Sequence, residues 1–566
     1  MRPLRSGPGP TGARQVQVVQ QSAVATQPAA ATPSVTGASP QVGGVRSLSR
    51  AAQIALLLAL VTGLITHAYH LFSYPLYSTD EGIYVERAWA VIREDRMSPQ
   101  TYVYDHAPGG WLLIALWEFL LPGHFETFSN PVAGGRLLVL LLHLASVFFL
   151  FEIARKLSGG RLVAPVVATF LFNFSPLAIY YQRMILLDNI MVFWVLLSIW
   201  LLIRTRHGLF TGLWSGLAFG VAVVTKENAI FFAPTIFYLL VRGTHDDSNR
   251  SFALTFWVFG SAISVLGYVL FATLKGELLP AQLSLSLSHP PQGHVSLLYE
   301  LWYQIHRNQG TLFAPGGYLR AMWLPKDRFL LGIGTMAMLA CLAIGWQERK
   351  QDPALLVAGT LAFEIAFYLG RGSVILDFYV LPLIPTYALC TGLVADRMVK
   401  RLPASTPRLA VPIASALALA LLLAPTGGYV VKHGTYGQLQ LADQYNVPLT
   451  YLQQEQIAWI RQHIPRTAKI ITDDDIWVAL HDAQPSYPYA QSHWNAVSDP
   501  QVRNIFGGGN SQDINYIVMS NGMKHAMILN NANGQENWIL SALNNATQVW
   551  QVTRGSVSLA IYQVQG

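Results

Sequence analysis

Charged residues are scarce in this chain of 566 residues. Asp, Glu, Lys and Arg make up 12% of it, and 52% of the residues are hydrophobic. Soluble domains have roughly 25% charged residues, and they need them to cover a surface that faces water. A mostly water-soluble protein is therefore excluded. The composition predicts a polytopic α-helical membrane protein.

Cysteine is almost absent as well. Cys341 and Cys390 are the two cysteines of the chain, and both fall within apolar segments. A cysteine in an apolar helix is usually a packed free thiol. We therefore predict neither a disulfide framework nor a thiolate metal site.

Acidic residues are missing altogether from the first 50 residues, which contain five arginines. Much of the net charge of +7 arises there, so it gives no indication of nucleic-acid binding, and basic residues beside membrane spans usually report topology. The same segment is rich in Ala, Pro, Gln and Ser without periodicity. We expect residues 1–50 to form a disordered cytoplasmic tail.

Long apolar runs follow, and about eleven of them are expected to cross the membrane. They lie at residues 51–72, 134–154, 162–180, 189–203, 209–224, 228–241, 252–274, 329–346, 353–370, 374–395 and 409–425. Together they define a transmembrane domain over residues 51–428. The shorter apolar run 111–121 is expected to be an interfacial helix.

The Lys and Arg residues are concentrated in alternate loops, such as the loop with Arg155, Lys156 and Arg161. Short cytoplasmic loops carry this excess, so the charges predict the orientation of a multi-pass protein in the cell membrane. The other loops and the C-terminal region are then extracytoplasmic.

The first of these outer loops carries the adjacent acids Asp80 and Glu81, and then Asp105 and His106 in a turn. A carboxylate that accepts a proton, beside groups that meet a phosphate, suits sugar transfer from a lipid phosphate. Each has a simpler interpretation too. The acid pair suits a helix N-cap followed by a first-turn acid, and His106 suits a solvated loop histidine.

Further charged residues lie at the outer ends of apolar segments. They are Arg183, Asp188, Lys226, Glu227 and Arg371. A charge at membrane depth costs about 2.5 to 3.5 kcal/mol by insertion scales, so several on one side of the membrane indicate a shared polar cavity. The alternatives are an interfacial Lys226–Glu227 ion pair, an Arg371 that reaches the headgroups, and a capping role for Asp188.

Residues 429–566 are polar and rich in Asn and Gln. Helical spacing at 449–464 and 538–544, and short strands at 469–472, 516–519 and 556–564, predict a soluble α/β domain. The run Asp473–Asp475 is interpreted as a turn that ends a strand, and cation binding is the alternative. Gly507–Gly509 lacks the context of a nucleotide-binding loop.

The acid pair Asp80–Glu81, the turn 105–108, the stretch 182–188 and the motif 378–385 together resemble the GT-C glycosyltransferases. Within them the chain is similar to the protein O-mannosyltransferase and lipid A aminoarabinose transferase branch. The resemblance covers residues 50–425. It implies that Asp80 is the catalytic acid/base residue with Glu81 beside it, that basic outer-loop groups hold a polyprenyl phosphate, and that further residues line the site. These are Asp105, His106, Arg183 and Asp188.

Two departures accompany the resemblance. Ala107–Pro108–Gly109 stands where the family often has two consecutive prolines, and no sugar-binding insert lies between the spans. A protein acceptor is thus not implied, and the acceptor is a glycan, a lipid or a protein.

We therefore predict a membrane glycosyltransferase that moves a sugar from a polyprenyl-phosphate donor to an extracytoplasmic acceptor with inversion. Arg183, His106, Lys226 or Arg371 would stabilise the leaving phosphate. The sequence requires no cofactor, although Asp80 and Asp105 are suited to a divalent metal. A transporter or flippase for a lipid-linked sugar is the alternative, and a membrane-anchored binding module is a third interpretation.

Overall fold

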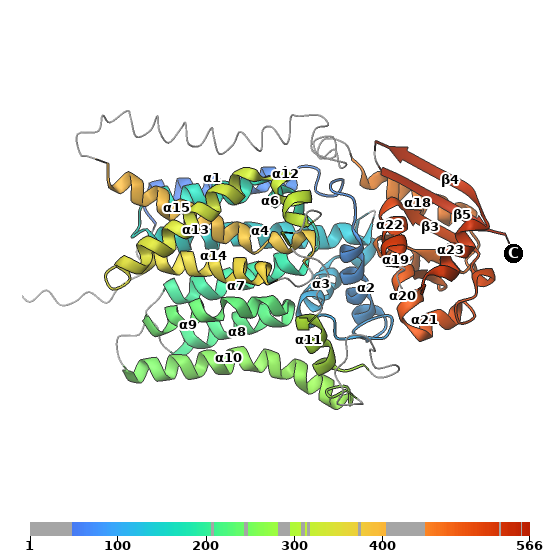
Figure 1. The fold of residues 1–566 in the computed structure, drawn as a ribbon, viewed down its shortest axis with the longest axis horizontal. Helices are drawn as coiled ribbons and strands as arrows, with labels where there is room; N and C mark the ends of the chain where they lie inside the picture. Colours follow the sequence, from blue (N-terminus) through green and yellow to red (C-terminus); the bar gives the residue numbers. More distant parts are fainter. Residues whose placement is uncertain are drawn as a thin grey trace, which may run out of the picture. The chain divides into compact units, whose positions relative to one another are not determined.

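The protein is described by a computed structural model for residues 48–128, 130–204, 209–242, 247–280, 295–306, 312–313, 317–371, 375–402, 448–530, 534–555 and 557–565. All elements named below belong to the compact unit Arg50–Gly566 (Figure 1). Most of the predicted N-terminal tail and the last predicted span, 409–425, lie outside the described residues.

Each of the other predicted spans coincides with helical structure. The helices are α1 (Arg50–Ala68), α4 (Pro131–Leu157), α5 (Val163–Phe174), α6 (Pro176–Tyr181), α7 (Leu187–Arg204), α8 (Leu209–Thr225), α9 (Ala233–Arg242), α10 (Asp247–Leu274), α13 (Arg328–Glu348), α14 (Ala354–Gly370) and α15 (Leu383–Lys400). Among the described residues, five helical segments are long and apolar enough to cross a membrane. This confirms a helical polytopic protein, while the count of eleven spans stays a prediction.

Three predicted spans are not single α-helices, and one of them, 374–395, consists of the 3₁₀ helix η4 (Asp377–Val380) followed by α15. The span 162–180 breaks at Ser175, because Pro176 has no N–H and disfavours helical backbone in the residue before it. The span 228–241 begins as the 3₁₀ helix η2 (Glu227–Phe232) and becomes the α-helix α9 only at Ala233.

Glycines allow α8 and α10 to pack with their backbones in contact. A Cβ at Gly216 would lie 2.2 Å from the carbonyl oxygen of Trp257, and Gly212 and Gly220 face α10 in the same way. Small residues four apart permit this approach between membrane helices. The packing fixes α8, and the chain turns directly after it at Lys226.

The first outer loop contains two helices, α2 (Thr79–Arg93) and α3 (Gly109–Leu120). Ala88 and Trp89 of α2 are buried. The remaining short helices of the membrane-associated part are η1 (His124–Glu126), α11 (Leu297–His306), η3 (Leu319–Trp323), α12 (Leu324–Lys326) and η4 (Asp377–Val380).

The C-terminal region forms a five-stranded sheet in the order β2-β1-β3-β5-β4. Strand β1 is parallel to β2 and β3, and β5 is antiparallel to β3 and β4. The elements are α18 (Thr450–His463), β1 (Ile470–Thr472), α19 (Asp474–His481), β2 (Ala490–Ser492), α20 (His493–Ser498), α21 (Pro500–Ile505), η5 (Ser511–Asp513), β3 (Tyr516–Ser520), α22 (Asn521–Asn530), α23 (Asn537–Asn544), β4 (Ala546–Arg554) and β5 (Val557–Val564).

The helices and strands predicted in this region from apolar spacing are confirmed. Strands β2 and β4 were not predicted, because β2 has three residues and β4 is mostly polar and exposed. The predicted turn at Asp473 is instead a helix start, since Asp473 caps α19.

Helix α2 packs against α19, which joins the first loop to the C-terminal region (Figure 1). A Cβ at Gly82 would lie 2.3 Å from the carbonyl group of Asp474. At the other end of α2, Asp482 accepts hydrogen bonds from Trp89 Nε1 and Arg93 Nε, both at 2.9 Å. Both contacts place the loop and the C-terminal region on one side of the bundle.

Candidate active site

Helix α2 starts at a capping box built from Ser78 and Glu81. The Ser78 hydroxyl accepts a hydrogen bond from the Glu81 amide at 3.4 Å, and Glu81 Oε2 accepts one from the Ser78 amide at 3.1 Å. This reciprocal pair satisfies two amide groups that a helix start leaves without partners. Ser78 is therefore the N-cap, and the interpretation of Asp80 as the cap is wrong.

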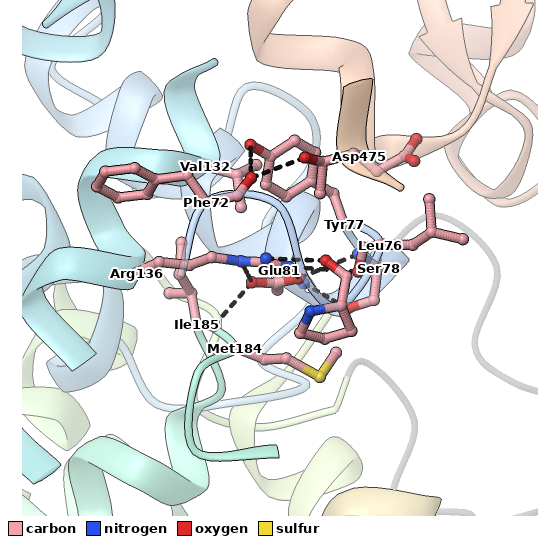
Figure 2. Close-up of polar contacts among 12 residues, drawn as sticks. Phe72, Leu76, Tyr77, Ser78, Glu81, Val132, Arg136, Met184, Ile185 and Asp475 are labelled. Atoms are coloured by element: carbon pink, nitrogen blue, oxygen red, sulfur yellow. Dashed lines mark hydrogen bonds and ion pairs between the residues drawn. The ribbon is translucent and has the colours of Figure 1, made fainter. Parts of the chain in front are cut away.

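Glu81 also forms a bidentate ion pair with Arg136 of α4 (Figure 2). Arg136 Nε lies 2.8 Å from Oε1 and Arg136 Nη2 lies 2.7 Å from Oε2, and the Ile185 amide donates to Oε1 at 3.0 Å. Neither side chain of the pair is exposed to solvent. Both carboxylate oxygens of Glu81 are thus occupied within the protein.

Asp80 lies in the same helical turn as Glu81, but its side chain has different surroundings. Its side chain is partly exposed, and among the described residues no hydrogen bond or ion pair involves it. Burial raises its pKa to about 6, Lys226 and His106 act to lower the pKa, and Asp377 and Asp188 act to raise it. Asp80 is a carboxylate without a partner in the field of a lysine, a histidine and two other acids.

Asp188 and Lys226 form the buried ion pair of the site. Asp188 lies in the first turn of α7, and its Oδ2 accepts a hydrogen bond from the Lys226 ammonium. The ammonium also lies 4.1 Å from the centre of the Tyr379 ring and 5.0 Å from that of Phe378. Aromatic faces and a carboxylate together stabilise the buried cation.

Glu227 pairs with His106, and the expected Lys226–Glu227 ion pair is wrong for this structure. Glu227 Oε2 lies 3.4 Å from His106 Nδ1, and Oε1 accepts a hydrogen bond from the Ala107 amide at 2.7 Å. Adjacent residues after α8 thus reach different partners, because the extended backbone at Lys226 directs the two side chains apart.

Asp105 forms an ion pair with Arg87 of α2 at 2.9 Å. Burial acts to raise the pKa of Asp105, but Arg87 and His106 outweigh it, so the pKa lies below its usual value. The Arg87 guanidinium also lies 4.8 Å from the centre of the Trp111 ring. Arg87 is not among the predicted site residues, since an arginine on a helix normally faces water.

The two other predicted basic residues have different surroundings. Arg183 is fully buried and donates to the backbone carbonyls of Thr66 and Tyr69 next to the end of α1. Arg371 lies at the end of α14, with its guanidinium 4.0 Å from the centre of the Tyr368 ring. Arg183 thus binds backbone, whereas Arg371 stacks on an aromatic ring.

Asp377 joins the site although the sequence analysis did not select it. Its Oδ2 accepts a hydrogen bond from the Tyr181 hydroxyl at 2.8 Å, and its charge influences Asp80. An acid directly before an apolar run was the available signal, as at Asp188. Lys326, another missed residue, places its ammonium 4.5 Å from the centre of the Tyr180 ring, and burial lowers its pKa to about 8.

Few side chains could hold the divalent metal for which the sequence suggests Asp80 and Asp105. Within the described ranges, no three His, Cys, Asp or Glu side chains are grouped so that they would hold a metal ion. Asp105 already neutralises Arg87. These surroundings do not fit a metal shared by Asp80 and Asp105.

The arrangement combines two chemical capacities. Asp80, with a pKa about 6, is largely ionised at neutral pH and is basic enough to accept a proton from a hydroxyl group. Lys226, which acts on the same carboxylate, supplies positive charge for an anionic leaving group, and His106 offers a ring N–H as a hydrogen-bond donor.

Comparison with known proteins gives a family match and several similar structures. Residues 106–272 match the family described as dolichyl-phosphate-mannose-protein mannosyltransferase. Comparison with curated protein sequences gives no significant match.

Among solved structures, apo ArnT from Cupriavidus metallidurans aligns with a TM-score of 0.54 and 16% identity, over 91% of this chain and 98% of that one. ArnT bound to undecaprenyl phosphate aligns with a TM-score of 0.52 and 15% identity over the same shares. The archaeal oligosaccharyltransferase AglB from Archaeoglobus fulgidus aligns with a TM-score of 0.53 and 13% identity, over 91% of this chain and 74% of that one.

At these identities the structures show a common fold, and the family match adds a sequence relationship that runs from His106, at the end of the first loop, through most of α10. Both agree with the resemblance stated from the sequence. Together they identify the chain as a membrane glycosyltransferase of GT-C fold.

Proposed function

We propose that this protein transfers a sugar from a polyprenyl-phosphate donor to an acceptor hydroxyl on the outer side of the cell membrane. The reaction is a single displacement that inverts the anomeric carbon. Asp80 is the catalytic base, and Lys226 and His106 stabilise the phosphate that leaves.

The observation that carries the proposal is the state of Asp80. Almost every other acid near it is paired: Glu81 with Arg136, Asp105 with Arg87, and Asp188 with Lys226. A carboxylate with a raised pKa, no partner among the described residues and two basic neighbours has the properties of a general base beside an anionic ligand.

The acceptor oxygen forms a bond to the anomeric carbon while the bond from that carbon to the phosphate oxygen breaks. The hydroxyl proton passes to Asp80, and the bond electrons leave with the polyprenyl phosphate. Negative charge develops on the departing oxygen, so one well-placed donor such as Lys226 contributes about 3 kcal/mol.

The donor class is supported by the site and by a relative. ArnT, which shares the fold, has been solved with undecaprenyl phosphate bound. In this chain the buried Lys226 and the half-buried His106 are the basic residues that act to lower the pKa of Asp80. Arg371 at the end of α14 is a further candidate for the phosphate.

Three predicted site residues receive positioning roles instead. Glu81 and Arg136 fix the start of α2, so Glu81 orients Asp80. Asp105 with Arg87 holds the turn that carries His106. Arg183 donates hydrogen bonds to backbone carbonyls at the end of α1 and so stabilises that end. Their side chains are engaged within the protein.

The predicted outer location is supported by α4. Arg136 binds the first loop near the start of this helix, and Arg155 and Lys156 lie in its last turn. At ~1.5 Å per residue, the 20 residues between Arg136 and Lys156 span about 30 Å, the thickness of a bilayer core. The loop and the basic residues would then lie on opposite sides.

Transfer of radiolabelled sugar from a synthetic polyprenyl-phosphate donor to added acceptor, with the purified chain in detergent, tests the proposal. We expect product from the parent chain and at least about 100-fold less from Asp80→Asn. A flippase would move the labelled donor across proteoliposomes without forming product, and that result would refute the transferase proposal.

A further inference from the structure

A cavity of about 470 Å³ lies between the first loop and the C-terminal region. Its walls come from the end of α2 and the residues that follow, and from α19, β2 and α21. The volume falls within the range of about 300 to 1,000 Å³ that is usual for small-molecule sites. It is separate from the cluster around Asp80, because none of the cluster residues lines it.

Aromatic rings form one wall of the cavity. Trp89 of α2 packs edge to face on Trp477 of α19, with ring centres 5.3 Å apart, and Trp477 stacks on His481 at 3.5 Å. The Trp89 indole is fixed by its hydrogen bond to Asp482. Trp477 and Trp89 are buried, and the partly exposed His481 ring that stacks on Trp477 is the most accessible of the three. A rigid aromatic ring at a cavity wall suits the C–H face of a sugar ring, because it is already ordered.

The rest of the lining combines polar side chains with four apolar residues, Pro99, Pro488, Val502 and Ile505. Three amides, Gln100, Gln491 and Gln501, and two carboxylates, Glu94 and Asp499, line the cavity, and no Lys or Arg is among its described lining residues. Burial lowers the pKa of His481 to about 4, so its imidazole is neutral at pH 7. Glu94 forms an ion pair with Arg96, which does not line the cavity, and Asp499 accepts hydrogen bonds from the Thr101 and Gln501 amides. Amides bind hydroxyl groups, whereas a lining with carboxylates and without Lys or Arg does not attract a phosphate.

We propose that this cavity binds the acceptor as a neutral oligosaccharide. The assignment rests on the proposed transferase function and adds a second site to it. The donor phosphate belongs beside Lys226 and His106, where the positive charges lie. The sugar chain of the acceptor belongs in the cation-free cavity, where aromatic and amide groups lie.

The spacing along α2 sets the relationship between the two sites. At ~1.5 Å per residue, the nine residues from Asp80 to Trp89 cover about 14 Å along the helix axis. That distance is longer than a single sugar unit. The cavity therefore holds the acceptor at a unit distant from the hydroxyl group that reacts, and a monosaccharide would not reach both sites.

The test is the equilibrium binding of linear mannotetraose to the full chain in detergent, measured by titration calorimetry. Ser486→Trp fills the cavity from a partly exposed loop position, and Ser498→Trp is the matched control at an exposed position that does not line it. We expect the tetrasaccharide to bind the parent and Ser498→Trp equally. Ser486→Trp should bind at least about tenfold more weakly.

A second variant and its control, Gln501→Ala and Gln512→Ala, remove side-chain atoms instead of filling the cavity. Gln501 lines the cavity, and Gln512 is exposed outside it. Weaker binding in Gln501→Ala alone supports the assignment. Absence of binding to the parent, or equal affinity for parent and Ser486→Trp, overturns it.

The two proposals fail in different ways. If sugar transfer occurs and Ser486→Trp keeps the parent KM for an oligosaccharide acceptor, the cavity assignment is wrong and the transferase function stands. If mannotetraose binds in the cavity but no donor yields product, the transferase function is wrong while the saccharide site stands. Inorganic phosphate serves as the probe for anions, and its competition with mannotetraose would also overturn the assignment.

Discussion

The Arg136 guanidinium donates hydrogen bonds to both oxygens of the Glu81 carboxylate, and neither side chain is exposed to solvent. The acid one residue earlier, Asp80, has no such partner among the described residues. Adjacent acids on one helical turn therefore have different chemistry. The first prediction follows from that difference.

Asp80→Asn should reduce the rate of sugar transfer at least about 100-fold, because an amide cannot accept the acceptor proton. Donor binding should persist. The raised pKa means that the fold favours the protonated carboxyl, so Asp80 contributes stability at low pH that is lost as the pH rises through about 6. The variant should therefore melt no lower than the parent at pH 7.

Radiolabel transfer, donor titration and thermal melting check these outcomes. Asp95→Asn is the matched control, since Asp95 is an exposed acid in the same loop. Near-normal turnover in Asp80→Asn would move the base to another residue.

The pH dependence of kcat/KM should have an acid limb near 6, where burial places the pKa of Asp80. The ionised carboxylate is the active form, so activity falls as the pH decreases. At pH 5 the rate should be about tenfold below its plateau. Initial rates from pH 4 to 8 measure the limb. A limb close to pH 4 would indicate an ordinary solvated carboxyl.

Glu81→Gln should act on stability. The change leaves the buried Arg136 charge without its counter-ion, and breaking a buried pair in this way costs about 3 to 5 kcal/mol. Thermal melting in detergent measures the loss, and Glu126→Gln, at an exposed position, is the control. If Glu81→Gln melts like the parent but loses all transfer activity, Glu81 is the base.

The double variant Asp188→Asn/Lys226→Gln should fold, because it removes both charges of a buried pair together. Its turnover should fall about 100-fold, because no ammonium group then stabilises the leaving phosphate. Lys469→Gln/Asp513→Asn removes a half-exposed pair in the C-terminal region and should be neutral. Equal turnover in the two double variants would exclude Lys226 from the reaction.

Cysteine labelling should establish the orientation in intact cells. An impermeant maleimide should react with Thr101→Cys and Gln512→Cys, which are exposed in the first loop and the C-terminal region. Lys156→Cys, exposed in the last turn of α4, should react only after permeabilisation. Ser158 is buried and would be a poor reporter. The reverse pattern would place Asp80 in the cytoplasm.

The sequence by itself determined the class of protein and the positions of its acids. Apolar length predicted the helices, because any segment in lipid must satisfy its own backbone hydrogen bonds. Charges at the ends of those segments marked Asp188 and Lys226, since their cost in an apolar setting is evident from composition alone. The family resemblance pointed to Asp80.

Only the tertiary structure decided which charges pair. Arg136 meets Glu81 from 55 positions away and Lys226 meets Asp188 from 38 positions away, and no local pattern encodes such contacts. Lys226 and Glu227 are adjacent in sequence yet reach separate partners. The cavity between α2 and the C-terminal region likewise depends on packing between segments almost 400 positions apart, as in the Trp89–Asp482 hydrogen bond. Local propensity fixes a helix, but the partner of a side chain is set by which helices lie next to it.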